Sequence, residues 1–386
     1  MKVVVYSSSN PVLYQALEEI KHKFVEDKIL TDFDFLLISL NYKYPYEKLD
    51  RDLRRVFNLD GREYLAFHST ESIENTKIVE GIAICFIKFE NKGRVRIYTD
   101  EGISNYVERG TLERLVNYLE ENKEHLNLFI SAWEDNNLGL FIEDLGNFLY
   151  SRGFYPNLVG GVSSGKIYEG ELRTFQIHNG KVIKDGFTVI TFENVEYCFG
   201  ISLGFKPISP VYMVSKADGY KIYEVDGNTP FINIVKGFLS GLEERVEYLW
   251  YCPIVILEEE EGYVKVQRTF KELGKDYVEF FAPVYEGERF MLSFGEPNML
   301  IENTKREILK IKNKLNTPDM LLNFSCIARQ FVLENKRTLE NEIISQILDA
   351  PLFGFATYGE IGPDKDFKKV KLYNETATVV ALKERS

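Results

Sequence analysis

Apolar and polar positions along the chain repeat one order of elements three times. In each repeat an apolar run ends in a serine, at Ser39, Ser131 or Ser325, and a later apolar run ends in two consecutive hydroxyl-bearing residues. These pairs, which begin 30, 32 and 32 residues after the three serines, are Ser69-Thr70, Ser163-Ser164 and Thr357-Tyr358. Self-similarity at a near-constant spacing is typical of a repeated structural unit. We therefore expect one unit used three times, with its polar loops as the candidate site.

Each unit is predicted to begin with a short strand and an amphipathic helix. In the first helix, apolar residues spaced by four, three and four positions lie on one face; they are Leu13, Leu17, Ile20 and Phe24. The first strands are predicted at residues 3–6, 95–98 and 290–294, and the closing strands at 81–87, 186–190 and 376–382. Strands that are apolar almost throughout are typical of sheets covered on both faces. The order β-α-β-α-β-β predicts an α/β fold with mixed β-sheets and outer helices.

The three units are predicted to span residues 1–92, 93–200 and 289–386. Between the second and the third, the connecting segment is rich in turn residues and has strand patterns of its own. Thr229-Pro230 is a good N-cap and first helical position, so we expect a helix to begin at Phe231. A domain boundary placed there gives two domains, 1–228 and 229–386.

Composition and charge limit the possible partners and cellular location of the protein. The 386 residues are 45% hydrophobic and 27% charged, as in a globular chain long enough for two or three domains. The net charge of −12 would repel a phosphate backbone, and no basic run indicates nucleic acid or a membrane surface as a partner. No stretch approaches membrane-spanning length, so a cytoplasmic protein is expected. The four cysteines lack CxxC spacing, which favours reduced thiols over disulfides or a metal site.

Motifs at both ends of the chain carry a resemblance to a known family. The C-terminal motifs are Ser325-Cys326-x-x-Arg329, then Gly354-Phe355 with Gly359-Glu360-Ile361-Gly362, then Asn374-x-Thr376. They resemble the C-terminal domain of the FIST family of predicted sensory proteins. The N-terminal half is similar to the family's other domain through Ser69-Thr70, Gly160-Gly161 and residues 204–208, 214–217 and 223–227.

The resemblance covers nearly the whole chain, with a departure in the first unit. The family often has Gly-Cys-Ser-Thr-x-Gly-Glu there, whereas residues 67–72 read Phe-His-Ser-Thr-Glu-Ser and lack both glycines. The resemblance implies a sensory module that binds a small polar ligand, such as an amino acid or a related metabolite. Many relatives join these domains to kinase, cyclase or chemotaxis modules. Because this chain ends 12 residues after Asn374, its output is expected to pass through a separate signalling protein of that kind.

Two groups of residues are candidates for the ligand site. In the loop from Gly160 to Gly165, backbone N–H groups with Ser163 and Ser164 form either an anion nest or a plain tight turn. The loop lacks the Lys-Ser/Thr ending of a nucleotide-binding P-loop. In the third unit, Arg329 follows a buried strand and needs a charged partner, for which we expect Glu360.

Arg329 and Glu360 form either a structural ion pair or a clamp for an amino acid, with Arg329 on the carboxylate and Glu360 on the ammonium group. Cys326, Thr357, Tyr358 and Asn374 belong to the same motifs and complete the predicted ligand site. Tyr358 either closes the pocket or fills the core.

Cys326 and two histidines are the basis of two alternative functions, an enzyme and a haem sensor. Cys326 is a packing thiol or, in an enzyme of amide or acyl chemistry, a nucleophile with His68 or Glu360 beside it. Some family members are linked to haem, and His68 or His178 would be the axial ligand of a haem-dependent gas sensor. The expected function is therefore a cytoplasmic sensor of a small polar ligand that needs no cofactor, with the enzyme and the haem sensor as alternatives.

Overall fold

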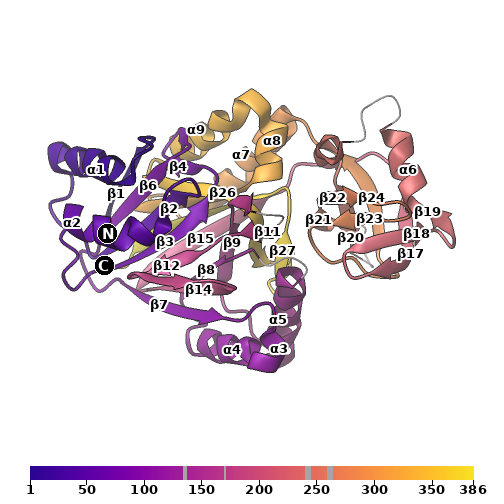
Figure 1. The fold of residues 1–386 in the computed structure, drawn as a ribbon, viewed down its shortest axis with the longest axis horizontal. Coiled ribbons are helices and arrows are strands. Elements are labelled where there is room, and N and C mark those ends of the chain that lie inside the picture. Colours follow the sequence, from indigo (N-terminus) through magenta and orange to yellow (C-terminus); the bar gives the residue numbers. More distant parts are fainter. Residues whose placement is uncertain (134–136, 169–170, 240–244, 259–263) are drawn as a thin grey trace.

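Two β-sheets packed face to face, with helices on their outer faces, form the body of the molecule, and a third sheet forms a small lobe beside it (Figure 1). The computed structural model describes residues 1–133, 137–168, 171–239, 245–258 and 264–386, of which residues 167, 168, 171–173 and 264 are described by their backbone alone. No helix within these ranges is both long and apolar enough to cross a membrane.

The N-terminal sheet and the helices outside it come mainly from the first unit. Their elements are β1 (Lys2–Ser8), α1 (Leu13–Asp27), β2 (Phe35–Asn41), η1 (Tyr46–Lys48), α2 (Leu49–Val56), β3 (Glu63–Ser69), β6 (Ile82–Lys88), β12 (Gln176–His178) and β13 (Lys181–Ile183). The strand order is β1-β6-β2-β3-β12-β13, and only β2 and β3 run parallel. Alternate residues of β1 serve two cores: Val3 and Val5 face the second sheet, whereas Val4 and Tyr6 face the helices.

The central sheet joins the second and third units. Its strands are β4 (Ser72–Glu74), β5 (Lys77–Val79), β7 (Arg94–Glu101), β8 (Leu126–Ser131), β9 (Leu158–Ser163), β14 (Gly186–Glu193), β15 (Val195–Ser202), β25 (Met320–Cys326), β26 (Leu352–Pro363), β27 (Val370–Tyr373) and β28 (Ala377–Glu384). The main order is β15-β28-β25-β26-β9-β8-β14-β7, and β4 and β27 also pair with β26. β10 (Lys166–Tyr168) and β11 (Glu171–Arg173) form a separate hairpin.

Helices cover the outer face of the central sheet in two groups. The first group, with α3 (Tyr106–Arg109), consists of α4 (Thr111–Glu121) and α5 (Leu138–Arg152), and it packs on the second unit. The second group consists of α7 (Pro297–Lys314), α8 (Ile327–Leu333), η3 (Glu334–Lys336) and α9 (Arg337–Leu348). Proline stands at the first turn of α7, where its missing N–H has no helical acceptor to lose.

The neighbour order β1-β6-β2-β3 recurs as β7-β14-β8-β9 and as β15-β28-β25-β26. In the third case one expectation was wrong, because residues 290–294 do not supply the first strand. They lie in the sheet of the small lobe, and β15 takes the first position, antiparallel to β28. The pattern misled because that lobe strand is also apolar and is also followed directly by a helix, α7.

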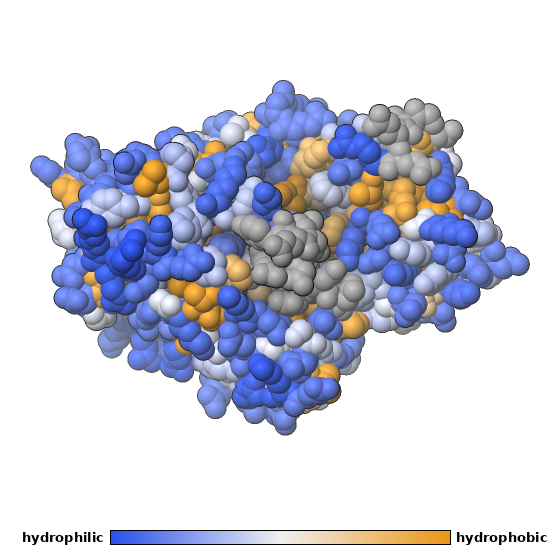
Figure 2. Space-filling view, viewed as in Figure 1, coloured by the Kyte–Doolittle hydropathy of each residue, from blue (hydrophilic) through white to orange (hydrophobic). Residues whose placement is uncertain are grey.

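The small lobe is inserted between β15 and α7. Its elements are β16 (Lys206–Pro207), β17 (Tyr212–Asp218), β18 (Lys221–Val225), β19 (Thr229–Pro230), α6 (Phe231–Phe238), η2 (Val246–Tyr251), β20 (Ile254–Leu257), β21 (Val264–Arg268), β22 (Phe270–Leu273), β23 (Val278–Phe280) and β24 (Arg289–Phe294). Its sheet takes strands from both sides of residue 228, and its core consists of its own residues together with Tyr373 of β27 in the body. Figure 2 shows hydrophobic side chains where the lobe meets the body, within a mostly hydrophilic surface.

Candidate functional site

The three motif strands end at one junction in the body. β9 and β26 pair directly, with Ser163 opposite Thr357. The first unit joins them through β4, where Ile73 lies opposite Gly354. The loops that follow the three hydroxyl pairs therefore meet although they lie far apart in the sequence.

Ser164 is the centre of this junction. Its Oγ accepts a hydrogen bond from the backbone N–H of Thr70 at 2.9 Å and donates to the carbonyl of Ala356. The N–H of Ala356 in turn donates to the carbonyl of Glu71 at 2.9 Å. Ser163 is equally buried, and its Oγ accepts a hydrogen bond from the side-chain amide of Gln176 at 3.0 Å. Both hydroxyls are thus engaged within the protein, so they join the units rather than line a cavity.

Beside the junction lies a cavity of about 140 Å³, the inner pocket. The body and the small lobe both line it; the residues are Trp133, Trp250, Thr269, Phe281, Cys326, Ile327, Ala328, Tyr358 and Asn374. Three of the residues predicted from sequence therefore come together there: Cys326, Tyr358 and Asn374.

Aromatic rings form the walls of the inner pocket. Trp133 stands edge-on to Phe281 and to Tyr358, with ring centroids 5.8 and 5.9 Å apart. The hydroxyl of Tyr358 donates to the carbonyl of Gly165 at 2.6 Å, which fixes the ring at the pocket wall and ties it to the second loop. Trp250 comes from the lobe, and its indole N–H donates to the carbonyl of Phe270. The indole N–H of Trp250 is thus satisfied within the lobe, which leaves its ring as an apolar wall.

Two polar atoms, one in the lining of the inner pocket and one next to it, have no hydrogen-bond partner among the described residues. Within the described part of the chain, neither Asn374 Oδ1 nor Glu375 Oε2 has a hydrogen-bond partner, and both atoms are buried. Glu375 Oε1 accepts from the hydroxyl of Thr269, which lines the pocket, at 2.9 Å. Glu375 also has a φ of 61°, a conformation that costs a residue other than glycine about 1–3 kcal/mol and that clusters at functional sites.

Two buried carboxyl groups, those of Glu360 and Glu375, lie near the inner pocket without lining it. Glu360 accepts hydrogen bonds from the Thr357 hydroxyl and from the Thr376 hydroxyl and N–H, the last two at 2.6 and 3.2 Å. Burial raises the pKa of Glu360 to about 8 and that of Glu375 to about 8. Both groups are therefore mostly protonated at neutral pH.

Cys326 is poorly suited to act as a nucleophile. Its side chain is 3% exposed, and burial followed by the charges of Glu360 and Glu375 raises the pKa of the thiol well above its ordinary value. A thiolate is the reactive species, and it is disfavoured here. The geometry supports the packing interpretation of this residue.

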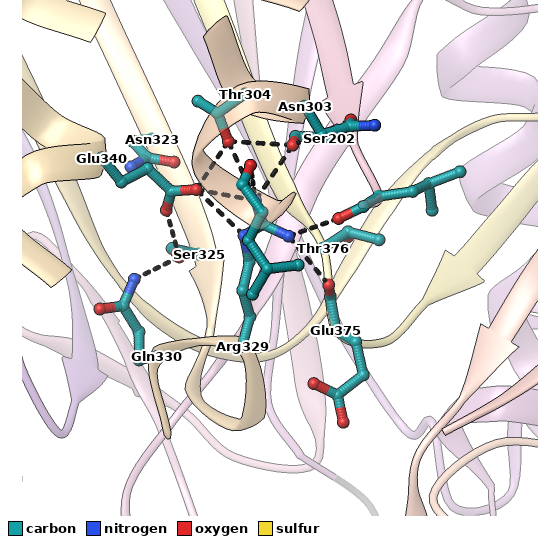
Figure 3. Close-up of polar contacts among 12 residues, drawn as sticks. Ser202, Asn303, Thr304, Asn323, Ser325, Arg329, Gln330, Glu340, Glu375 and Thr376 are labelled. Atoms are coloured by element: carbon teal, nitrogen blue, oxygen red, sulfur yellow. Dashed lines mark hydrogen bonds and ion pairs between the residues drawn. The ribbon is translucent and has the colours of Figure 1, made fainter. Parts of the chain in front are cut away.

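Arg329 does not pair with Glu360, and that expectation was wrong. Its guanidinium is fully buried and binds Glu340 of α9 at 2.9 Å, and the same head group donates to the hydroxyls of Ser202 and Thr304 (Figure 3). It also donates to backbone carbonyls, including that of Glu375, whose own carboxyl extends away from it (Figure 3). Every side of the guanidinium is occupied, so Arg329 joins β15, α7, α8 and α9 instead of facing the pocket.

An outer cavity of about 610 Å³ lies next to the inner pocket and shares Trp250 and Ile327 with it. Its lining includes Thr70 and Glu71 of the first unit, Arg337, and two further acidic residues, Glu80 and Glu334. One guanidinium nitrogen of Arg337 donates to both oxygens of Glu71, at 2.9 and 2.8 Å. Arg337 is thus a cation at the cavity wall, the role expected of Arg329.

The two histidines considered as haem ligands lie outside the inner pocket and the outer cavity. Both ring nitrogens of His68 are buried without a partner in the described structure, and the ring packs against Tyr46 and Phe175, with centroids 5.8 and 4.8 Å away. Burial lowers the pKa of His68 to about 4. Neither His68 nor His178 lines the inner pocket or the outer cavity. The described residues also contain no group of three or more histidine, cysteine, aspartate or glutamate side chains arranged to hold a metal ion.

Several residues of the site were not found from the sequence. Glu375 is the variable position of the Asn374-x-Thr376 motif, and Glu340 lies in a stretch without a distinctive pattern. Thr269 and Phe281 belong to the lobe, which no motif connected to the body. One feature of the sequence could have indicated the pocket, however. The chain has two tryptophans, and both line the inner pocket.

Two family models and a similar protein match large parts of the chain. The family model described as FIST N domain matches residues 35–228, and the model described as FIST C domain matches residues 242–363. A protein of Aquifex aeolicus (strain VF5), described as an uncharacterized protein, is 66% identical over 265 residues, which are 69% of this chain and 98% of that protein.

Proposed function

The chain belongs to the FIST family, whose domains suggest a sensory role, and we propose that it senses a small amine-bearing molecule bound in the inner pocket. The observation that carries this proposal is Asn374 Oδ1, a buried acceptor of the pocket lining that has no donor among the described residues. A buried acceptor without a partner costs free energy, and a ligand that donates N–H groups recovers it.

The surroundings favour an ammonium group among N–H donors. Aromatic walls attract cations through the negative faces of their rings, and the inner pocket has four such rings, those of Trp133, Trp250, Phe281 and Tyr358. The carboxyl groups of Glu360 and Glu375 supply negative charge once a cation lowers their pKa. An engineered cavity of about 150 Å³ binds benzene, so the inner pocket suits a group of similar size.

The rest of the ligand extends into the outer cavity. Arg337 and Gln330 line that cavity, and Gln330 Oε1 is buried without a partner in the described residues. An amino acid with its ammonium group in the inner pocket would place its carboxylate near Arg337, where it would take the place of Glu71 as a partner of the guanidinium. This arrangement keeps the expected ligand class while it moves the cationic role from Arg329 to Arg337.

A thermal-shift screen tests the proposal. Amino acids and small amines are compared with their analogues that lack the amino group, at equal concentration. A ligand at about 100 times its dissociation constant adds about 2.7 kcal/mol of stability. We expect the amine of at least one pair to raise the melting temperature and its partner to leave it unchanged. Equal shifts within every pair would contradict the proposal.

Asn374→Leu provides the matched variant. The substitution removes the acceptor at nearly constant volume, so the shift caused by the amine should disappear while the protein stays folded. Asn313→Leu, at an exposed position of α7, is the control and should keep the shift. The output partner, a separate kinase, cyclase or chemotaxis protein, and the cytoplasmic location stay predictions.

A further inference from the structure

A second cleft, of about 690 Å³, lies where the chain crosses between the body and the lobe. One wall is residues 203–206, which lead from β15 into the lobe, and another is the first half of α7, which follows the return crossing. We call this space the crossover cleft. It shares no lining residue with the inner pocket or the outer cavity.

Gln267 of β21 closes the crossover cleft from the lobe side. Its side chain has no exposed surface, and neither Oε1 nor Nε2 has a hydrogen-bond partner in the described part of the protein. Leaving a buried polar group unpaired costs about 1–3 kcal/mol. A ligand that offers one donor and one acceptor side by side would satisfy both atoms.

The rest of the cleft specifies more of such a ligand. Phe205 and Met299 supply apolar walls, and the exposed side chains of Lys206 and Arg306 supply positive charge at the rim. Glu302 is the acidic residue among them. The α7 residues of the cleft form two adjacent rows with a spacing of four positions, 298-302-306 and 299-303, so they lie on one face of the helix. The space therefore suits a flat body with a hydrogen-bonding edge and an anionic group.

We infer that the crossover cleft binds an adenine nucleotide. A glutamine amide pairs with the adenine edge that carries the N6 donor and the N7 acceptor: Nε2 donates to N7, and Oε1 accepts from N6. Lys206 and Arg306 contact the phosphate, and the thioether of Met299 packs on the base. Guanine presents two acceptors at the same edge and would leave Gln267 Oε1 unpaired.

Nucleotide binding has a consequence for the inner pocket, and this step alone rests on the proposed function. Gln267 lies two residues before Thr269, which lines the inner pocket together with Trp250 and Phe281 of the same lobe. A ligand that contacts residues 203–206, the first half of α7 and β21 holds the lobe against the body. It thereby holds three walls of the inner pocket in place.

Calorimetric titration of the full chain with AMP, GMP and adenosine tests the inference. We expect AMP to bind saturably, GMP at least tenfold more weakly, and the Gln267→Leu variant to lose at least tenfold in affinity for AMP. Because Leu removes two unpaired polar atoms, the melting temperature of that variant should not fall, so lost binding is not lost folding. No saturable heat with AMP, or equal affinity for AMP and GMP, would overturn the inference.

The Lys206→Ala variant tests the contact with the phosphate independently of the contact with the adenine base. It should weaken AMP severalfold and leave adenosine unchanged, whereas Lys275→Ala, at an exposed position elsewhere in the lobe, should change neither. Unchanged AMP affinity in a folded Gln267→Leu protein would overturn the inference even if AMP binds. Amine binding in the inner pocket is measured without nucleotide, so either proposal can fail alone.

Discussion

Thr70 and Ser164 lie 94 residues apart, and the backbone N–H of Thr70 donates to Ser164 Oγ at 2.9 Å. This contact joins the hydroxyl pair of the first unit to that of the second, and Ser164 continues to the third unit through the carbonyl of Ala356. The polar pairs that marked the units in the sequence therefore hold the units together.

Replacing Ser164 with Ala should destabilise the protein by about 1–3 kcal/mol, because the change leaves the N–H of Thr70 and the carbonyl of Ala356 buried without their partner. Chemical denaturation measures the loss. Ser151→Ala removes a hydroxyl that donates to a backbone carbonyl at an exposed position and should cost far less. Equal effects of the two substitutions would show that the junction contributes little.

Arg329→Met should lower the free energy of unfolding by about 3–5 kcal/mol, because it leaves the buried carboxylate of Glu340 without its cation. The double variant Arg329→Met/Glu340→Leu should be less destabilised than the single one, since it removes both charges. Ligand affinity of the folded fraction should not change. A large loss of ligand affinity with little loss of stability would contradict the structural role of Arg329 and support its original assignment to the ligand site.

Much of this fold was predictable because apolar periodicity reports burial directly. The strands and helices of the first two units follow from positions such as Leu13 and Leu17, which both face the same core. The insertion of the small lobe was not predictable from the sequence pattern. β24 is an apolar strand followed by an amphipathic helix, which is the pattern expected of the first strand of a unit, although β15 occupies that position. Only hydrogen-bond pairing across the sheet distinguishes the two strands.

The candidate site was predicted in part for a similar reason. Cys326, Tyr358 and Asn374 lie in motifs that the sequence displays, and they do line one pocket. The partner of Arg329 was predicted wrongly, because the choice between Glu360 and Glu340 depends on which helix packs over β25. Sequence spacing does not contain that information.

The buried acids predict a pH dependence of stability. The pKa of Glu375 is about 8 in the folded protein, above its ordinary value of 4.5. The folded state thus keeps a proton that the unfolded state releases, and the free energy of unfolding falls as pH rises from about 4.5 to about 8. Glu375→Gln cannot lose a proton, so its stability relative to the wild type should increase across that window. Denaturation at pH 5 and pH 8 measures this.

Glu196→Gln, at an exposed position of β15, is the control for charge alone and should follow the wild type. A stability difference between the Glu375→Gln and wild-type proteins that stays constant between pH 5 and pH 8 would contradict the pKa assignment.

Cys326 should react slowly with iodoacetamide at pH 7.5, more slowly than a cysteine in an unstructured peptide, because burial disfavours its thiolate. Mass spectrometry of the alkylated peptide gives the rate, and Cys326→Ser confirms the assignment. Alkylation faster than the peptide would instead favour the enzyme hypothesis.

The central claim is that an amine binds between the walls of the inner pocket, and intrinsic tryptophan fluorescence tests it most directly. The two tryptophans of the chain, Trp133 and Trp250, both line that pocket, so the signal arises at the site itself. A titration with the amine selected by the screen should give a saturable change in emission. The same titration should give none with the analogue that lacks the amino group, and none in the Asn374→Leu protein. A saturable change of equal midpoint in the wild-type and Asn374→Leu proteins, or none with any amine, would contradict the account.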